Sequence, residues 1–85
     1  MQLTKPVDGT DYYVRACKVS EIREILKLDD EMEMMAKLAQ VCTTFDGNPL
    51  WPTIEAANNA DWPIVQRCAM AAMEVNGMGG DDSGN

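Results

Sequence analysis

Residues able to bind a metal ion or to move a proton gather at one place in this sequence, the acidic run that contains Asp29, Asp30, Glu31 and Glu33. Carboxylate oxygens are ligands that calcium prefers, but a calcium loop alternates them around a tight glycine turn. Here an apolar helical pattern starts at once, and acidic residues favour the positive end of a helix. We therefore interpret the run as the beginning of a helix and expect no metal site.

Two glycine-containing motifs near the end of the sequence resemble sites of known chemistry. Gly-Met-Gly-Gly at residues 77–80 follows a predicted helix rather than a strand and has no lysine nearby, unlike a phosphate-binding loop. Asp-Asp-Ser-Gly at residues 81–84 lacks the helix start at which an acyl carrier protein holds its phosphopantetheine serine. The chain also has no histidine, the side chain used most often for general acid–base catalysis. We expect no catalytic residue and no cofactor, and therefore no enzyme.

The three cysteines, Cys17, Cys42 and Cys68, lie far apart in the sequence among apolar neighbours. An odd number argues against a closed set of disulfide bonds. There is no Cys-x-x-Cys pair, so the spacing of a zinc site is missing. We interpret each cysteine as a small buried thiol, which fits a reducing cytoplasm.

Charge and hydropathy exclude two classes of partner. The net charge is −7, from 14 acidic and 7 basic residues, and the basic residues are scattered. Binding to a nucleic-acid backbone needs clustered lysine and arginine, so we expect no nucleic acid and interpret the acidity as an aid to solubility. No apolar run approaches the ~20 residues that cross a membrane. Residues 1–6 also lack the apolar core of a signal peptide.

The patterning predicts a mainly α fold, with only a minor β part, in a single domain over residues 1–77. Residues 2–7 and 11–17 are expected to form a small N-terminal β-hairpin around the Asp-Gly turn at residues 8–9. A lone hairpin is unstable in water, so it must pack on helices. Residues 78–85, rich in glycine and acidic residues, are predicted to form a disordered tail.

About four helices are expected after the hairpin. Ser20 is predicted to cap a first helix that ends near residue 28, and Asp29 or Asp30 a second that ends at residue 42 or 43. A turn follows at residues 46–49. Thr53 is predicted to cap a short third helix, and Asp61 a last helix that ends at the Asn-Gly sequence of residues 76–77.

Seven methionines are many for 85 residues. Most are expected to fill the core, and the rest to form an adaptable apolar surface, because methionine side chains repack around varied partners. Such a surface suits the binding of a helix in a groove. The residues predicted to contact a partner are Met32, Met35, Met70, Met73, Trp51 and Trp62.

The order of these pieces resembles the tail assembly chaperones of long-tailed bacteriophages, over roughly residues 12–80. The matching pieces are Val-Arg at residues 14–15 in an early strand, Ser-Glu at 20–21 at a helix start, and Asp-Gly-Asn-Pro-Leu-Trp at 46–51. Ile-Glu-Ala at 54–56 and Val-Asn-Gly-Met at 75–78, followed by an acidic tail, complete the order. Longer family members have a longer N-terminus and a basic loop between the first helices, which this sequence lacks.

The resemblance implies a non-catalytic protein that acts in the cytoplasm of the infected host cell and is absent from the virion. Such chaperones coat the helical tape measure protein, keep it soluble and bring tail tube subunits to it. The implied partners are therefore the tape measure protein and the tail tube protein, together with further copies in a homo-oligomer. In many such phages a ribosomal frameshift extends the product, and the segment after Gly77 is where an extension would attach.

The alternative is a small acidic inhibitor that mimics DNA and blocks a host nuclease or CRISPR complex. Such a mimic needs carboxylates in two phosphate-like rows on its surface. The acidic run at residues 29–33 is too local to supply them. The chaperone hypothesis is therefore preferred.

Overall fold

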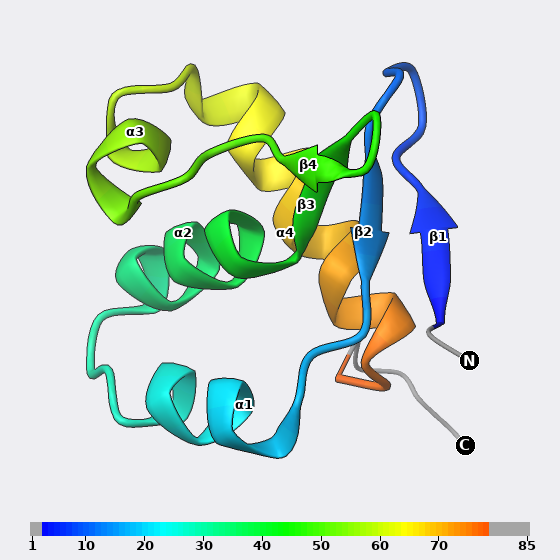
Figure 1. Ribbon diagram of the computed structural model, residues 1–85. Helices are drawn as coiled ribbons and strands as arrows, with labels where there is room; N and C mark the ends of the chain where they lie inside the picture. The colour runs from blue at the N-terminus through cyan, green and yellow to red at the C-terminus, as the bar shows by residue number, and fades with distance from the viewer. Residues whose placement is uncertain (1–2, 79–85) are drawn as a thin grey trace.

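The computed structural model describes residues 3–78 and shows a four-stranded antiparallel sheet beside four helices (Figure 1). Helices make up 51% of these residues and strands 14%. None of the helices in residues 3–78 is long and apolar enough to cross a membrane. In chain order, the elements are β1 (Thr4–Pro6), β2 (Tyr13–Arg15), α1 (Val19–Leu26), α2 (Glu31–Cys42), β3 (Thr43–Phe45), β4 (Asn48–Pro49), α3 (Ile54–Asn58) and α4 (Trp62–Val75).

The prediction of a mainly α fold with a single hairpin was wrong. A second hairpin completes a four-stranded sheet, so the fold is of the α+β class. Strands β3 and β4 flank a two-residue turn in which Asp46 and Gly47 both have positive φ, 55° and 83°. Strand β3 also pairs with β2, which gives the order β1-β2-β3-β4. Strands of two or three residues are too short to show an alternating pattern, so the sequence predicted only a turn at residues 46–49, a range that includes β4.

The predicted N-terminal hairpin is confirmed, with shorter strands. Strands β1 and β2 lie inside the predicted ranges and pair in an antiparallel register that sets Lys5 opposite Val14. Val14 is fully buried, whereas Tyr13 is half exposed. Pro6 lies on the edge strand, where its missing N–H leaves no neighbour unpaired.

The predicted starts of α2 and α3 agree with the structure, and at each of them a side chain caps the backbone. The Asp30 carboxylate accepts from the N–H of Met32 (2.9 Å), and the Thr53 hydroxyl accepts from the N–H of Ala56 (3.1 Å). Helix α1 instead begins after Lys18 rather than at the predicted Ser20.

The different start of α1 follows from Glu21, whose carboxylate reaches back and accepts from the N–H of Lys18 at 2.8 Å. At α4, Asp61 holds the N-cap position through its backbone conformation, and its side chain makes no capping bond within the described residues. The predicted acidic tail lies outside the described residues from residue 79 onward.

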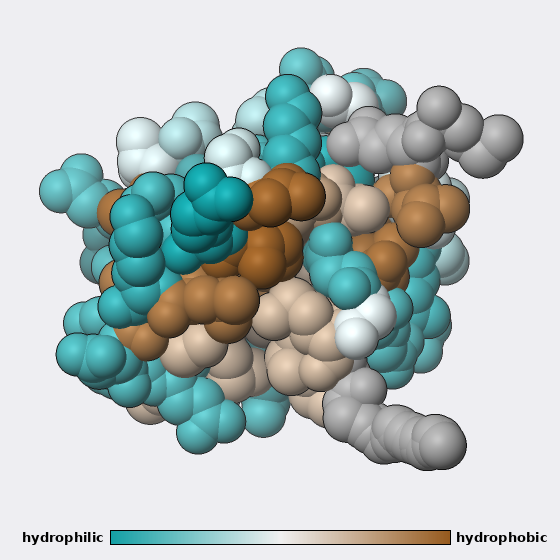
Figure 2. All heavy atoms as spheres, turned by 90° about the horizontal axis from the view of Figure 1, so that it is seen from below, coloured by the Kyte–Doolittle hydropathy of each residue, from teal (hydrophilic) through white to brown (hydrophobic). Residues whose placement is uncertain are grey.

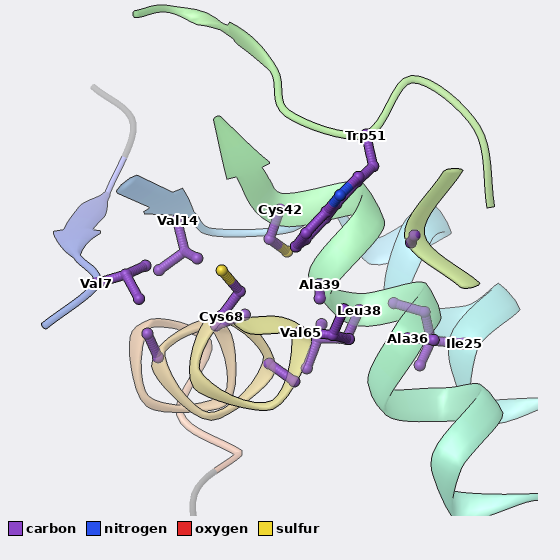
Figure 3. Close-up of a cluster of buried hydrophobic side chains, with 14 residues drawn as sticks. Val7, Val14, Ile25, Ala36, Leu38, Ala39, Cys42, Trp51, Val65 and Cys68 are labelled. Atoms are coloured by element: carbon purple, nitrogen blue, oxygen red, sulfur yellow. The ribbon is translucent and has the colours of Figure 1, made fainter. Parts of the chain in front are cut away.

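The core lies between the sheet and helices α2 and α4 (Figure 3). Helix α4 packs against α2 and also against β1 and β2. Three alanines of these two helices, Ala39, Ala69 and Ala72, are fully buried. The indole ring of Trp51 points toward the end of α2 near Cys42. The small side chains let the two helix backbones approach closely.

A buried hydroxyl without a partner provides a test of this packing. Thr43 is fully buried, and its Oγ1 has no hydrogen-bond partner within the described residues. The thiol of Cys68 lies beside it, but sulfur is a weak partner. Valine has the same shape without the unsatisfied hydroxyl.

We expect Thr43→Val to raise the free energy of unfolding by about 1 kcal/mol in a denaturant titration. Thr44→Val is the matched control in the same strand, because the Thr44 hydroxyl donates to the carbonyl of Tyr13. It should leave stability unchanged or lower it. Equal effects of the two changes would contradict the assignment of an unsatisfied hydroxyl at residue 43.

Candidate functional site

An apolar groove lies where α1, α2 and α4 meet, with a volume of about 660 Å³. Figure 2 views the molecule from the side of α1 and shows hydrophobic side chains gathered at the middle of this face, among hydrophilic ones. Five of the seven methionines line the groove. The complete lining is Ile25, Glu31, Met34, Met35, Leu38, Gln66, Met70, Met73, Glu74 and Met78.

Two helical stripes form the groove walls. Helix α2 contributes residues 31, 34, 35 and 38, and α4 contributes residues 66, 70, 73 and 74. Both sets follow the spacing of three and four residues that keeps side chains on one face of a helix. Ile25 and Leu38 are buried at the floor, while Met70 is 55% exposed. The groove is therefore an apolar trough that is open to solvent.

The end of α4 places a fifth methionine in the groove. The N–H of Met78 donates to the carbonyl of Met73 (2.7 Å), and the N–H of Gly77 donates to that of Glu74 (3.1 Å). This pair of bonds is a Schellman motif, which needs a left-handed residue after the helix. Gly77 supplies it, with φ of 71°. The motif turns the chain back so that Met78 and Met73 line the same groove.

The rim of the groove is polar and acidic. Glu31 and Gln66 are exposed. Glu74 forms an exposed ion pair with Lys5, with 3.2 Å between Oε1 and Nζ. Since exposed pairs of this kind contribute little to stability, the rim charges are free to respond to a charged partner.

The structure brings three of the six predicted contact residues together. Met35, Met70 and Met73 all line the groove. Met32 and Trp62 instead line a separate hollow of about 240 Å³ beside α3. Trp51 is 8% exposed and belongs to the core.

Two methionines of the groove, Met34 and Met78, were not among the predicted contacts. Met34 belongs to the methionines that were expected to fill the core, and it shares one face of α2 with Leu38, four residues further on. Met78 was assigned to the tail. The Asn-Gly-Met sequence is the signal that could have placed it, because it fits the end of a Schellman motif.

A second hollow, of about 870 Å³, lies beside α1 and α2 and is lined mainly by polar residues, including Arg15, Glu21 and Lys37. The Arg15 guanidinium is already occupied: its two terminal nitrogens donate to both carboxylate oxygens of Glu21, at 3.0 and 2.9 Å. That hydrogen-bonded pair lowers the pKa of Glu21 to about 2. The residues 3–78 hold no cluster of three metal-ligating side chains. We therefore take the apolar groove, which we name the methionine groove after its five methionines, as the candidate site.

No protein-family model, no curated protein and no solved structure matches this chain.

The ion pair of Arg15 and Glu21 predicts a dependence of stability on pH. The pKa of Glu21 is lower in the folded state, about 2, than its ordinary value of 4.5. The unfolded chain therefore binds the proton more readily, and this contribution is present above about pH 4.5 and is lost as the pH falls toward 2.

We expect Glu21→Gln to destabilise the protein at pH 7 and to have a smaller effect at pH 3, measured by denaturant titration at both values. Glu24→Gln is the control on the same helix, because Glu24 forms an exposed pair with Lys27. It should change stability little at either pH. A loss for Glu21→Gln that is independent of pH would contradict the ion-pair assignment.

The Schellman motif predicts a link between one backbone position and the groove. At both Gly77 and Gly47 φ is positive, and an added Cβ would meet no described atom within 4 Å. Alanine at either position should lower the free energy of unfolding by about 1–2 kcal/mol, because the left-handed conformation disfavours a side chain. Only Gly77→Ala should also change the groove, detectable as a shift of the Met73 and Met78 methyl signals in NMR spectra. Equal shifts in the two variants would count against the link.

Proposed function

We propose that this protein is a tail assembly chaperone of a long-tailed bacteriophage. In the host cell cytoplasm it would bind a helical segment of the tape measure protein in the methionine groove and help to recruit tail tube subunits, without catalysis. The observation that supports this proposal is the gathering of five methionines in one open groove. The order of the sequence motifs indicates the class of partner, and the groove is the surface that we propose for binding it.

The shape of the groove favours a helical client. One stripe of long, flexible side chains from α2 and one from α4 form an apolar trough, a shape that can receive the apolar face of an amphipathic helix. Methionine adapts to clients of varied sequence, because its side chain is unbranched and its sulfur is polarizable. A tape measure protein is long, so its chaperone must accept many different helical turns.

The negative charge of the groove rim indicates which charged residues the client segment carries. Glu31 and Glu74 lie at the edges of the groove, and the whole chain carries a net charge of −7. Basic residues beside the apolar face of the client would complement these carboxylates and speed association. The remaining acidic surface would keep the complexes apart from one another in solution. The proposed client segment is therefore an amphipathic helix with lysine or arginine at its flanks.

Co-expression with the tape measure protein tests the proposal, with two matched variants. Met70 in the groove and Met32 outside it are similarly exposed, 55% and 57%. Both changes to lysine should leave the fold intact. Met70→Lys places a charge in the apolar trough and should lower the co-purified, soluble client about tenfold, equivalent to roughly 1.4 kcal/mol of binding free energy. Met32→Lys should behave like the unchanged protein.

The proposal fails if the unchanged protein neither solubilises nor co-purifies with the client. If binding occurs but Met70→Lys and Met32→Lys weaken it equally, the chaperone function stands and the groove is not its site. Circular dichroism of each variant establishes that lost binding does not reflect lost folding.

A further inference from the structure

We propose that Cys17 and Cys42 form a disulfide bond in the folded protein, by exchange with a low-molecular-weight disulfide such as oxidised glutathione. The two Sγ atoms lie 2.6 Å apart, although the residues are 25 positions apart in the sequence. A disulfide bond is about 2.05 Å long, so a small movement separates the thiol pair from the bonded state. This inference rests on the thiol geometry and is independent of the proposed function.

The backbone around the pair holds the two thiols in place. Cys42 is the last residue of α2, and Cys17 lies in the connection between β2 and α1. The side chain of Asn76, at the end of α4, accepts from the N–H of Cys17 at 2.6 Å. Its Nδ2 lies 3.9 Å from the Sγ of Cys42. One amide therefore positions the backbone of the first cysteine and contacts the sulfur of the second.

The two cysteines are suited to different steps of the exchange. Cys17 is half-buried, and the hydrogen bond from Cys42 lowers its pKa, with the Arg15 guanidinium and Asn76 acting in the same direction. Cys42 is fully buried, and its pKa is raised by the shared hydrogen bond with Cys17 and by burial. Since the thiolate is the attacking species, Cys17 is the first nucleophile and Cys42 the resolving thiol.

The reaction has two steps. The Cys17 thiolate attacks one sulfur of oxidised glutathione, forms a mixed disulfide and releases a glutathione thiolate. Cys42 then loses its proton and attacks the Cys17 sulfur, which forms the internal bond and expels the second glutathione. Two protein thiols are oxidised, one molecule of oxidised glutathione is reduced, and the two protons end on the two glutathione thiols.

The third cysteine provides an internal control. Cys68 is fully buried on α4, and burial raises the pKa of its thiol. It should remain reduced in the folded protein and react with an alkylating reagent only after unfolding. Selective linkage of the other two cysteines would then be a property of the fold rather than of thiols in general.

The test incubates the folded chain with oxidised glutathione and then maps peptides without reduction. We expect the intact protein to lose two hydrogen atoms, and one cross-linked peptide pair to contain Cys17 and Cys42. The bond closes a loop across the β2–α1 connection, α1 and α2, so the midpoint of thermal unfolding should rise by roughly 10 °C relative to the reduced protein. A linkage that involves Cys68, or the absence of any internal linkage, would overturn the proposal.

Two variants test the order of the steps. Cys42→Ala should accumulate a glutathione adduct on Cys17, because the resolving thiol is missing. Cys17→Ser should take up no adduct in the same time, because Cys42 is fully buried. An adduct on Cys42 in the second variant, or none on Cys17 in the first, would refute the assigned roles. The peptide map of the unchanged protein decides on the bond itself, whether or not both variants fold.

Discussion

The side chain of Asn76 joins two parts of the chain that are distant in sequence, the connection before α1 and the end of α4. Its Oδ1 accepts from the N–H of Cys17, and its Nδ2 donates to the carbonyl of Ala72 at 2.7 Å. Asparagine has an acceptor and a donor on one planar group, so it can make both bonds at once. A single hydrogen bond of this kind contributes only about 1 kcal/mol. Its importance is positional: it fixes where the chain enters α1 relative to the end of α4, and the groove lies between these elements.

Close packing of α2 and α4 explains why the methionines form a groove. Ala39, Ala69 and Ala72 are fully buried, and side chains this small let the helix backbones come close. The methionines lie to one side of that line of contact, with Met35 and Met73 half-buried and Met70 exposed. The core of a domain this small is necessarily modest. The alanines make this core compact, and the methionines that it does not take in lie at the surface.

The features that the sequence predicted well are those set by neighbouring residues. Caps at Asp30 and Thr53 depend on a side chain two or three positions from its partner; Thr53 was predicted, and Asp30 was one of two candidates with Asp29. The second hairpin depends on the pairing of β3 with β2, which is distant in the chain, and only its Asp-Gly turn was visible. Met32 was grouped with Met35 by residue type. Although it lies only three residues before Met35, Met32 faces α3 and lines the separate hollow there. The approach of Cys17 to Cys42 depends on the whole fold and has no local signal.

The hydrogen bonds and the ion pair that hold α1 in place lie almost entirely at its beginning. This asymmetry connects the groove with the cysteine pair. Glu21 holds Arg15 and the N–H of Lys18, and Asn76 holds Cys17 just before the helix. Toward its end, α1 has one buried side chain, Ile25, and this residue forms part of the groove floor. The position of that floor therefore depends on how firmly the start of the helix is held. A covalent bond at Cys17 would strengthen the end of α1 that is already tied, and would leave Ile25 to adjust to whatever occupies the groove.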